Sequence, residues 1–100
     1  MKTFEVEKWM HEDDPMWGTI REVDVPEAEL DGELLNDLGR IWHWGQNDFQ
    51  PKENYSLSVG DVIRYEGERY LICSMGFRRL DGDEKSKGMV ETSFRVEANV

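Results

Sequence analysis

The first side chains able to do chemistry are those of His11, Glu12, Asp13 and Asp14, which follow one another without a gap. An imidazole and three carboxylates are all metal ligands. A metal site, however, needs ligands that converge on one ion and are oriented by neighbouring groups. Four adjacent residues cannot all point at the same ion. We therefore expect no metal here and interpret the segment as an acidic surface loop.

His43 is the second candidate, because an imidazole can act as a general base. It would need a partner such as Asp48 within hydrogen-bond reach and a pocket for a substrate. A histidine in the last turn of a helix is also favoured simply by the helix dipole. The sequence contains no glycine-rich phosphate loop, no cysteine pair and no nucleophile elbow. We therefore expect a protein that is not an enzyme and carries no cofactor.

Aromatic and amide side chains gather around the end of the predicted helix. Together they could line a small-molecule pocket with aromatic walls, and the candidate ligand-binding residues are Trp42, Trp44, Gln46, Asn47 and Asp48. The alternative is local: the polar side chains satisfy the free carbonyls of the helix end and the amides of the next turn. Both interpretations stay open at this point.

Charge is distributed unevenly along the chain. The net charge is −10, and residues 1–37 hold twelve acids against three bases, whereas residues 38–100 come to only −1. Such a field repels phosphate backbones, so direct nucleic-acid binding is not expected, but it attracts a basic partner surface. The candidate partner-binding residues are Glu5, Glu7, Glu12, Asp13, Asp14, Glu22 and Asp24. The alternative is an acidic face that only keeps the protein soluble.

Length and cysteine content suggest one small domain in a reducing compartment. One hundred residues form a single domain, residues 1–100, and the only cysteine, Cys73, excludes an internal disulfide. Cys73 lies in an apolar strand-like run, which is typical of a buried thiol rather than a nucleophile. The sequence shows no signal peptide and no apolar run of about 18 residues. We expect a cytoplasmic protein that does not contact a membrane.

Alternation of apolar and polar residues predicts strands in the first quarter of the chain. Residues 3–9 contain aromatic and β-branched members and alternate from Phe4 to Glu7, with Trp9 just out of phase, which is typical of a half-buried strand. A second strand is predicted from Trp17 or Thr19 to Val25. Its alternation slips by one position between Ile20 and Val23, which indicates a bulge or a shorter strand.

A helix is predicted between the two strand-rich parts. Residues 26–29 resemble a first helical turn, with a proline early and acids at the positive end of the dipole. Gly32 weakens continuity, so the helix is expected to begin near Asp31, whose side chain would cap it. The apolar residues with helical spacing are Leu34, Leu38, Ile41 and Trp42. Gly45 is placed to end the helix in a left-handed conformation.

The second half of the chain is predicted to be rich in strands. Gly60 marks a turn, residues 62–65 and 69–74 form a hairpin around residues 66–68, and residues 77–80 and 89–96 are further strands. The fold class is therefore α+β. One amphipathic helix packs on a curved antiparallel sheet of five or six strands, or on a small, partly open SH3-like or PUA-like β-barrel.

Two segments carry a family resemblance. Residues 45–50 (GQNDFQ) and 56–62 (SLSVGDV), followed by Tyr70 and by the pair Gly76 and Phe77, resemble a group of small uncharacterised bacterial, phage and mobile-element proteins. These proteins carry a GQNDFQ segment and then an SVSVGDV segment, from which this chain departs at Leu57. The resemblance covers about residues 33–80. It implies a phage or plasmid accessory protein and supplies no catalytic residue.

These observations lead to three functional hypotheses. The first is a non-enzymatic accessory protein that binds another protein, in its sharpest form a phage or mobile-element inhibitor that mimics DNA and binds a basic, nucleic-acid-binding partner. The second is a small-molecule-binding domain with its pocket at the helix end. The third is a structural or interaction domain without a ligand. The sequence leaves the oligomeric state open.

Overall fold

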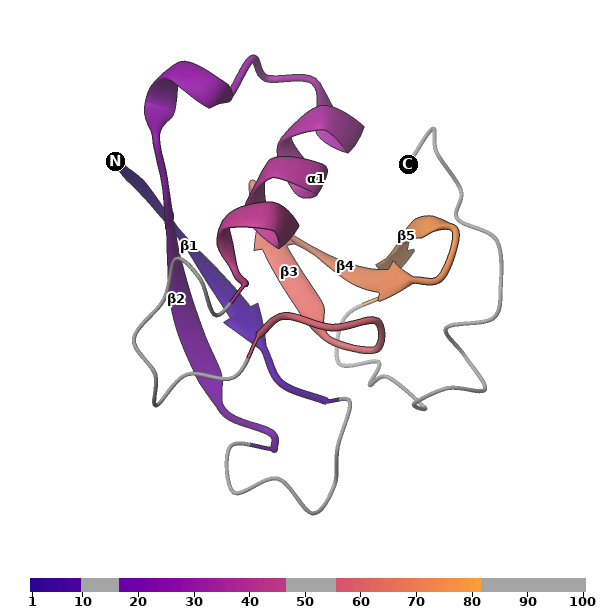
Figure 1. The fold of residues 1–100 in the computed structure, drawn as a ribbon. Coiled ribbons are helices and arrows are strands. Elements are labelled where there is room, and N and C mark those ends of the chain that lie inside the picture. The colour runs from indigo at the N-terminus through magenta and orange to yellow at the C-terminus, as the bar shows by residue number, and fades with distance from the viewer. Residues whose placement is uncertain (10–16, 47–55, 82–100) are drawn as a thin grey trace.

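The computed structural model describes residues 1–9, 17–46 and 56–81. Within these ranges one α-helix, α1, packs on one side of a five-stranded antiparallel sheet in the order β2-β1-β3-β4-β5 (Figure 1). The elements are β1 (Lys2–Glu7), β2 (Ile20–Val25), the 3-10 helix η1 (Glu27–Glu29), α1 (Leu34–Trp44), β3 (Val62–Tyr65), β4 (Glu68–Cys73) and β5 (Gly76–Leu80). The predicted α+β class is confirmed. The described strands form an open sheet that ends at β2 and β5.

Four of the described strands begin and end within two residues of the predicted positions, and β2 begins at Ile20, one residue after Thr19 and three after Trp17, the two predicted starts. Glu66 and Gly67 both have positive φ, 49° and 81°, as a tight two-residue hairpin turn requires. Gly60, at the predicted turn, also has positive φ, 103°. The strand predicted over residues 89–96 lies outside the described residues. No helix in the described ranges is long and apolar enough to cross a bilayer.

The one-position shift in the apolar–polar alternation of β2, between Ile20 and Val23, has a simple cause. Pairing with β1 is continuous from Glu7 opposite Ile20 to Lys2 opposite Val25, so β2 contains no bulge. Ile20 is 47% exposed and lies on the face of the sheet away from α1, whereas Val23 and Val25 are buried on the face toward it. The prediction of a bulge was wrong because it counted Ile20 as a core residue.

The start of α1 differs from the prediction in its capping residue. Glu33, not Asp31, is the N-cap, and its carboxylate accepts a hydrogen bond from the Asn36 N–H at 2.8 Å. Asp31 supports the cap from outside, since its carboxylate accepts from the Glu33 N–H and from the Asn36 side chain. Residues 27–29 form the separate turn η1, so the helix begins at Leu34.

Gly45 ends α1 for a reason other than the predicted one. Its φ is −80°, which any residue adopts, so the left-handed conformation was wrong. A Cβ at this position would lie 2.5 Å from Leu57 Cδ1 and 3.2 Å from the Ile41 carbonyl oxygen. The glycine is required because Leu57 packs directly on the helix end, and the Leu57 N–H donates to the Gly45 carbonyl at 3.0 Å.

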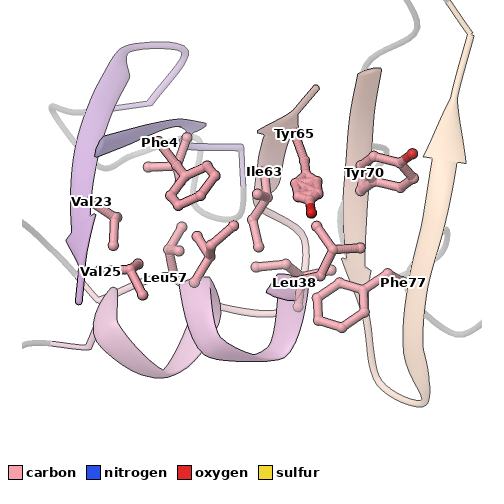
Figure 2. Packing of buried hydrophobic residues seen from close by; sticks show 12 residues of the cluster. Phe4, Val23, Val25, Leu38, Leu57, Ile63, Tyr65, Tyr70 and Phe77 are labelled. Carbon is pink, nitrogen blue, oxygen red and sulfur yellow. The ribbon is translucent and has the colours of Figure 1, made fainter. Parts of the chain in front are cut away.

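The main core fills the space between α1 and the inner face of the sheet, which we define as the face covered by the helix (Figure 2). Two aromatic pairs join its parts: Phe4 stacks on Tyr65 with ring centroids 5.9 Å apart, and Trp42 meets the ring of Phe77 edge-on at 5.9 Å. The buried members are Phe4, Val6, Val23, Val25, Leu38, Ile41, Leu57, Ile63, Tyr65, Tyr70, Ile72 and Phe77.

The opposite side of the sheet, the outer face, carries a second buried group on its β3–β5 half. Val62, Leu71 and Cys73 are fully buried and Leu80 is 2% exposed, and Trp9 packs against them. The β1–β2 half of the same face carries carboxylates instead. Alternation of side chains across each strand thus divides the outer face into an apolar half and an acidic half.

Strands β1 and β3 pair only at one end. The described register joins Val6 to Ile63 and Glu7 to Val62, and toward the start of β1 the two strands diverge (Figure 1). The stacked rings of Phe4 and Tyr65 fill this divergence on the inner face. On the outer face it leaves an open depression of about 590 Å³ between β1 and the β3–β4 hairpin.

Candidate functional site

The predicted partner-binding acids that the structure describes lie on the outer face, along β1 and β2. Glu5 is directly opposite Glu22 in the ladder, and Thr3 is opposite Asp24. Glu12, Asp13 and Asp14 lie outside the described residues, as does His11. No cluster of three potential metal ligands occurs in the described parts of the chain.

Glu7 is used inside the domain rather than at its surface. Its side chain is 4% exposed and accepts hydrogen bonds from Arg64, Arg69 and Trp9, at 2.7–2.8 Å. Burial alone would raise the pKa of Glu7, but the hydrogen bonds from Arg69, Arg64 and Trp9 together lower it to about 2. This carboxylate is therefore ionised and neutralised by two guanidinium groups, and it is unsuited to contact a partner.

Glu5 occupies an intermediate position. Its carboxylate lies 3.2 Å from the Arg64 guanidinium, and the two side chains are 53% and 37% exposed. An ion pair this accessible to water contributes little to stability. Glu5 thus shares a guanidinium with Glu7 and can still be reached from solution.

Glu22 and Asp24 are the described candidates that remain at the surface of the outermost strand. Both are exposed, and β2 has a neighbouring strand on one side only in the described sheet. Asp24 accepts a hydrogen bond from the Thr3 hydroxyl at 2.5 Å. Neither residue forms an ion pair with a described base. Glu22 also faces the like charge of Glu5 across the ladder, which costs stability.

The acidic surface continues beyond β2. Glu27, Asp31 and Glu33 are all exposed on the segment that leads from β2 to α1. Glu29 is the member of this run that lies near a base, 3.9 Å from Arg40, and both side chains are partly exposed. Exposed carboxylates therefore recur along the chain from Glu22 to Glu33.

The predicted small-molecule site is only partly described, because Asn47 and Asp48 lie outside the described residues. A shallow depression of about 360 Å³ is lined by Gly39, Trp42, His43 and Gln46, so two of the candidates share it. The exposed His43 also lies here. The indole ring of Trp44 lies near the imidazole of His43, with ring centroids 6.0 Å apart.

The polar groups of this depression have partners within the domain. Gln46 Nε2 donates to the carbonyls of Trp42 and Leu57, at 2.9 and 3.1 Å, and Trp42 Nε1 also donates to the Leu57 carbonyl. These bonds satisfy carbonyls at the helix end and in the returning chain, as in the local interpretation of these residues. Binding of a small molecule here remains a prediction.

Two buried carboxylates were not anticipated as important from the sequence. Asp61 is fully buried and accepts from Lys8 Nζ, the Trp9 N–H and the Ser58 N–H, at 2.7–2.9 Å. Lys8, 6% exposed, also donates to the Ser56 carbonyl at 2.7 Å. In the sequence, Asp61 directly follows the turn glycine Gly60. It therefore looks like an ordinary turn residue, and nothing in the local pattern indicates that it is buried.

Asp37 is the second such carboxylate, and it lies on the inner side of α1. It accepts from the Tyr65 hydroxyl at 2.5 Å and from the backbone N–H groups of Asp31 and Gly32 at 3.1 Å. Burial and the neighbouring carboxylate raise the pKa of the Tyr65 phenol, so it stays protonated and donates. The start of α1 is thereby fixed to β3.

Cys73 is buried, as predicted, and burial raises the pKa of its thiol. A thiol that resists ionisation is a poor nucleophile.

Comparison with known proteins adds no assignment: no protein-family model, no curated protein and no solved structure matches this chain. The arrangement of carboxylates is therefore the feature of this chain that indicates a function.

Proposed function

We propose that this chain acts by binding another protein, and that the carboxylates of β2 make the contact. The observation that carries the proposal is the difference between Glu7, which two arginines neutralise inside the domain, and Glu22 and Asp24, which are exposed on the outermost strand without an ion pair to a described base. Charges left without compensation attract an oppositely charged surface. The partner is expected to be basic.

The position of Glu22 supports a role outside the domain. Opposite Glu5, a lysine or arginine would stabilise the ladder, whereas two carboxylates repel each other. Charges on an edge strand also prevent unwanted association of sheet edges. That alternative needs no partner, and so it can be separated from the proposal by experiment.

A narrower form of the proposal names an inhibitor, from a phage or mobile element, of a partner whose basic surface normally holds nucleic acid. The run of exposed carboxylates from Glu22 to Glu33 would replace the phosphates of such a ligand. The cytoplasmic location expected from the sequence agrees with this form. The proposal does not depend on whether the sheet belongs to an SH3-like or PUA-like barrel.

The test is affinity capture from a nuclease-treated host lysate at low and high salt. Three proteins are compared: the unaltered chain, Glu22→Gln/Asp24→Asn, and the matched control Glu66→Gln/Glu68→Gln, which removes two exposed acids from the β3–β4 hairpin, one in its turn and one at the start of β4. We expect the unaltered chain and the control to capture the same basic protein at low salt and to lose it at high salt. The β2 variant should not capture it.

Two results would contradict the proposal. The first is equal capture by all three proteins, which would show that the carboxylates of β2 are not the contact. The second is that none of the three captures a protein, which would leave the exposed acids with a role in solubility. Added DNA that displaces the captured partner would support the narrower, nucleic-acid-mimicking form.

A further inference from the structure

We infer that β2 binds its partner by strand addition: an extended basic segment of the partner pairs with the outer edge of β2 and becomes the next strand of the sheet. This inference rests on the proposed function and specifies how the same residues would make contact. Strand addition is a common mode of peptide recognition, in which main-chain hydrogen bonds supply affinity and alternate side chains supply specificity.

The first observation is the direction of the backbone groups of β2. The Lys8 N–H donates to the Thr19 carbonyl at 3.1 Å, so the backbone of Thr19 faces β1. In an antiparallel ladder this direction alternates with every residue, and the β1–β2 register is unbroken. The residues whose backbone faces β1 are therefore Thr19, Arg21, Val23 and Val25, and those whose backbone faces away are Ile20, Glu22 and Asp24.

The second observation is that these outward groups are available in the described structure. No strand lies beyond β2 within the described residues, and no described backbone hydrogen bond outside the strand ladders involves Ile20, Glu22 or Asp24. Each of the three residues offers one N–H donor and one carbonyl acceptor. The outer edge of β2 therefore presents three donors and three acceptors at the spacing of a strand.

The third observation is that the same three residues have exposed side chains. Ile20, Glu22 and Asp24 all stand on the outer face. A second copy of this chain is a poor occupant, because antiparallel pairing of two β2 edges would bring carboxylates together in a protein of net charge −10. A strand with bases opposite Glu22 and Asp24 fits this edge.

The pattern of the partner follows from the register. The described strand pairs are all antiparallel, and antiparallel pairing is slightly more stable per residue than parallel pairing. An antiparallel segment would meet Asp24 first, then Glu22, then Ile20. Its residues at alternate positions would therefore be basic, basic and apolar, in that order along the chain.

The experiment uses a short fluorescent peptide with the core lysine–threonine–lysine–threonine–valine and blocked termini. In the inferred complex the lysine N–H groups face β2 and the threonine N–H groups face solvent. Two derivatives of this peptide each carry two methyl groups on backbone nitrogens. In the first derivative the two lysines are N-methylated, and in the second the two threonines are N-methylated. Binding of all three peptides to the full chain is measured at low salt by fluorescence anisotropy.

We expect methylation of the lysine amides to weaken binding about tenfold or more relative to methylation of the threonine amides, because only the former removes hydrogen bonds to β2. The Glu22→Gln/Asp24→Asn variant should bind the parent peptide more weakly. Equal binding of the two methylated peptides would overturn strand addition. If the two methylated peptides bound equally but Glu22→Gln/Asp24→Asn still bound the parent peptide more weakly, the contact would depend on charge alone. The proposed function would then stand without strand addition.

Failure of the parent peptide to bind would also overturn the inference. The proposed function is then decided independently by the capture experiment, because a partner can recognise the acidic surface without adding a strand. The two proposals can thus fail separately.

Discussion

The carboxylates inside the domain and those on its outer strand have the same chemistry but opposite surroundings. Asp61 and Glu7 are buried, and each accepts hydrogen bonds from a basic side chain and from further donors. Glu22 and Asp24 are exposed, and the nearest opposite charge on a described residue is not within ion-pair distance. Glu7 lies on β1, the strand next to β2, and Asp61 directly precedes β3, which is the next strand in the sheet.

This difference separates two uses of one residue type. A buried carboxylate that keeps its charge requires compensating donors, and losing one partner leaves the other uncompensated. An exposed carboxylate has little effect on folding but remains free to attract a partner. Substitutions at the two kinds of position should therefore differ strongly in their effect on the free energy of unfolding.

The largest effect is expected at Asp61. Asp61→Ala leaves the buried Lys8 ammonium without its carboxylate and removes acceptors for two backbone N–H groups. The free energy of unfolding at pH 7, measured by urea denaturation, should fall by about 3–5 kcal/mol. The double variant Lys8→Met/Asp61→Ala should lose less than the sum of the single variants. A loss below about 1 kcal/mol for Asp61→Ala would show that this pair is not essential.

A smaller, pH-dependent effect is expected at Glu7. Glu7→Gln should cost about 2 kcal/mol at pH 7, because Arg64 and Arg69 lose a shared carboxylate. The pKa of Glu7 falls from 4.5 to about 2 on folding, so its stabilising contribution is complete above pH 4.5 and is lost as the pH falls toward 2. The difference between the unaltered chain and Glu7→Gln should therefore shrink between these pH values.

The control for Glu7 is Glu5→Gln, which alters the exposed neighbour on the same strand. Its cost should stay below about 0.5 kcal/mol and change little with pH. Urea denaturation of the three proteins at pH 7, 4 and 3 makes the comparison. An equal loss of free energy of unfolding in Glu7→Gln and Glu5→Gln at pH 7 would show that the buried carboxylate of Glu7 stabilises the fold no more than the exposed carboxylate of Glu5.

The smallest effect is expected on β2. Glu22→Gln/Asp24→Asn should change the free energy of unfolding by no more than about 0.5 kcal/mol, and relief of the repulsion between Glu5 and Glu22 favours a slight gain. Thermal unfolding at low and high salt measures the change. A large loss would mean that these carboxylates are structural, and it would remove the basis for using this variant to test binding.

Local patterns were sufficient to locate the elements. Alternation placed the described strands within three residues, and the helical spacing of Leu34, Leu38 and Ile41 located α1, because both periods follow directly from backbone geometry. The errors occurred where a local signal has two explanations. Gly45 suited a left-handed cap, but it is small because Leu57, twelve positions later, packs against it.

The candidate site depended more on distant contacts. In the sequence, Glu5, Glu7, Glu22 and Asp24 form one set of acids. Only the placement of β1 between β2 and β3 brings Arg64 and Arg69 to Glu7 and leaves Glu22 without an ion pair to a described base. Lys8 and Asp61, 53 positions apart, meet for the same reason. Strand order is set by the packing of the whole domain, so a local pattern cannot provide it.

The packing of Leu57 on Gly45 has a consequence for how this chain can change in length. The Gly45 carbonyl accepts from the Leu57 N–H, while Trp42 and Gln46 donate to the Leu57 carbonyl, so residues 46 and 56 are held close together. An insertion between Gly45 and Gln46 would move the Gln46 side chain away from the carbonyls of Trp42 and Leu57, which it joins. This end of α1 therefore does not admit an added residue without loss of the contact between the helix and the returning chain.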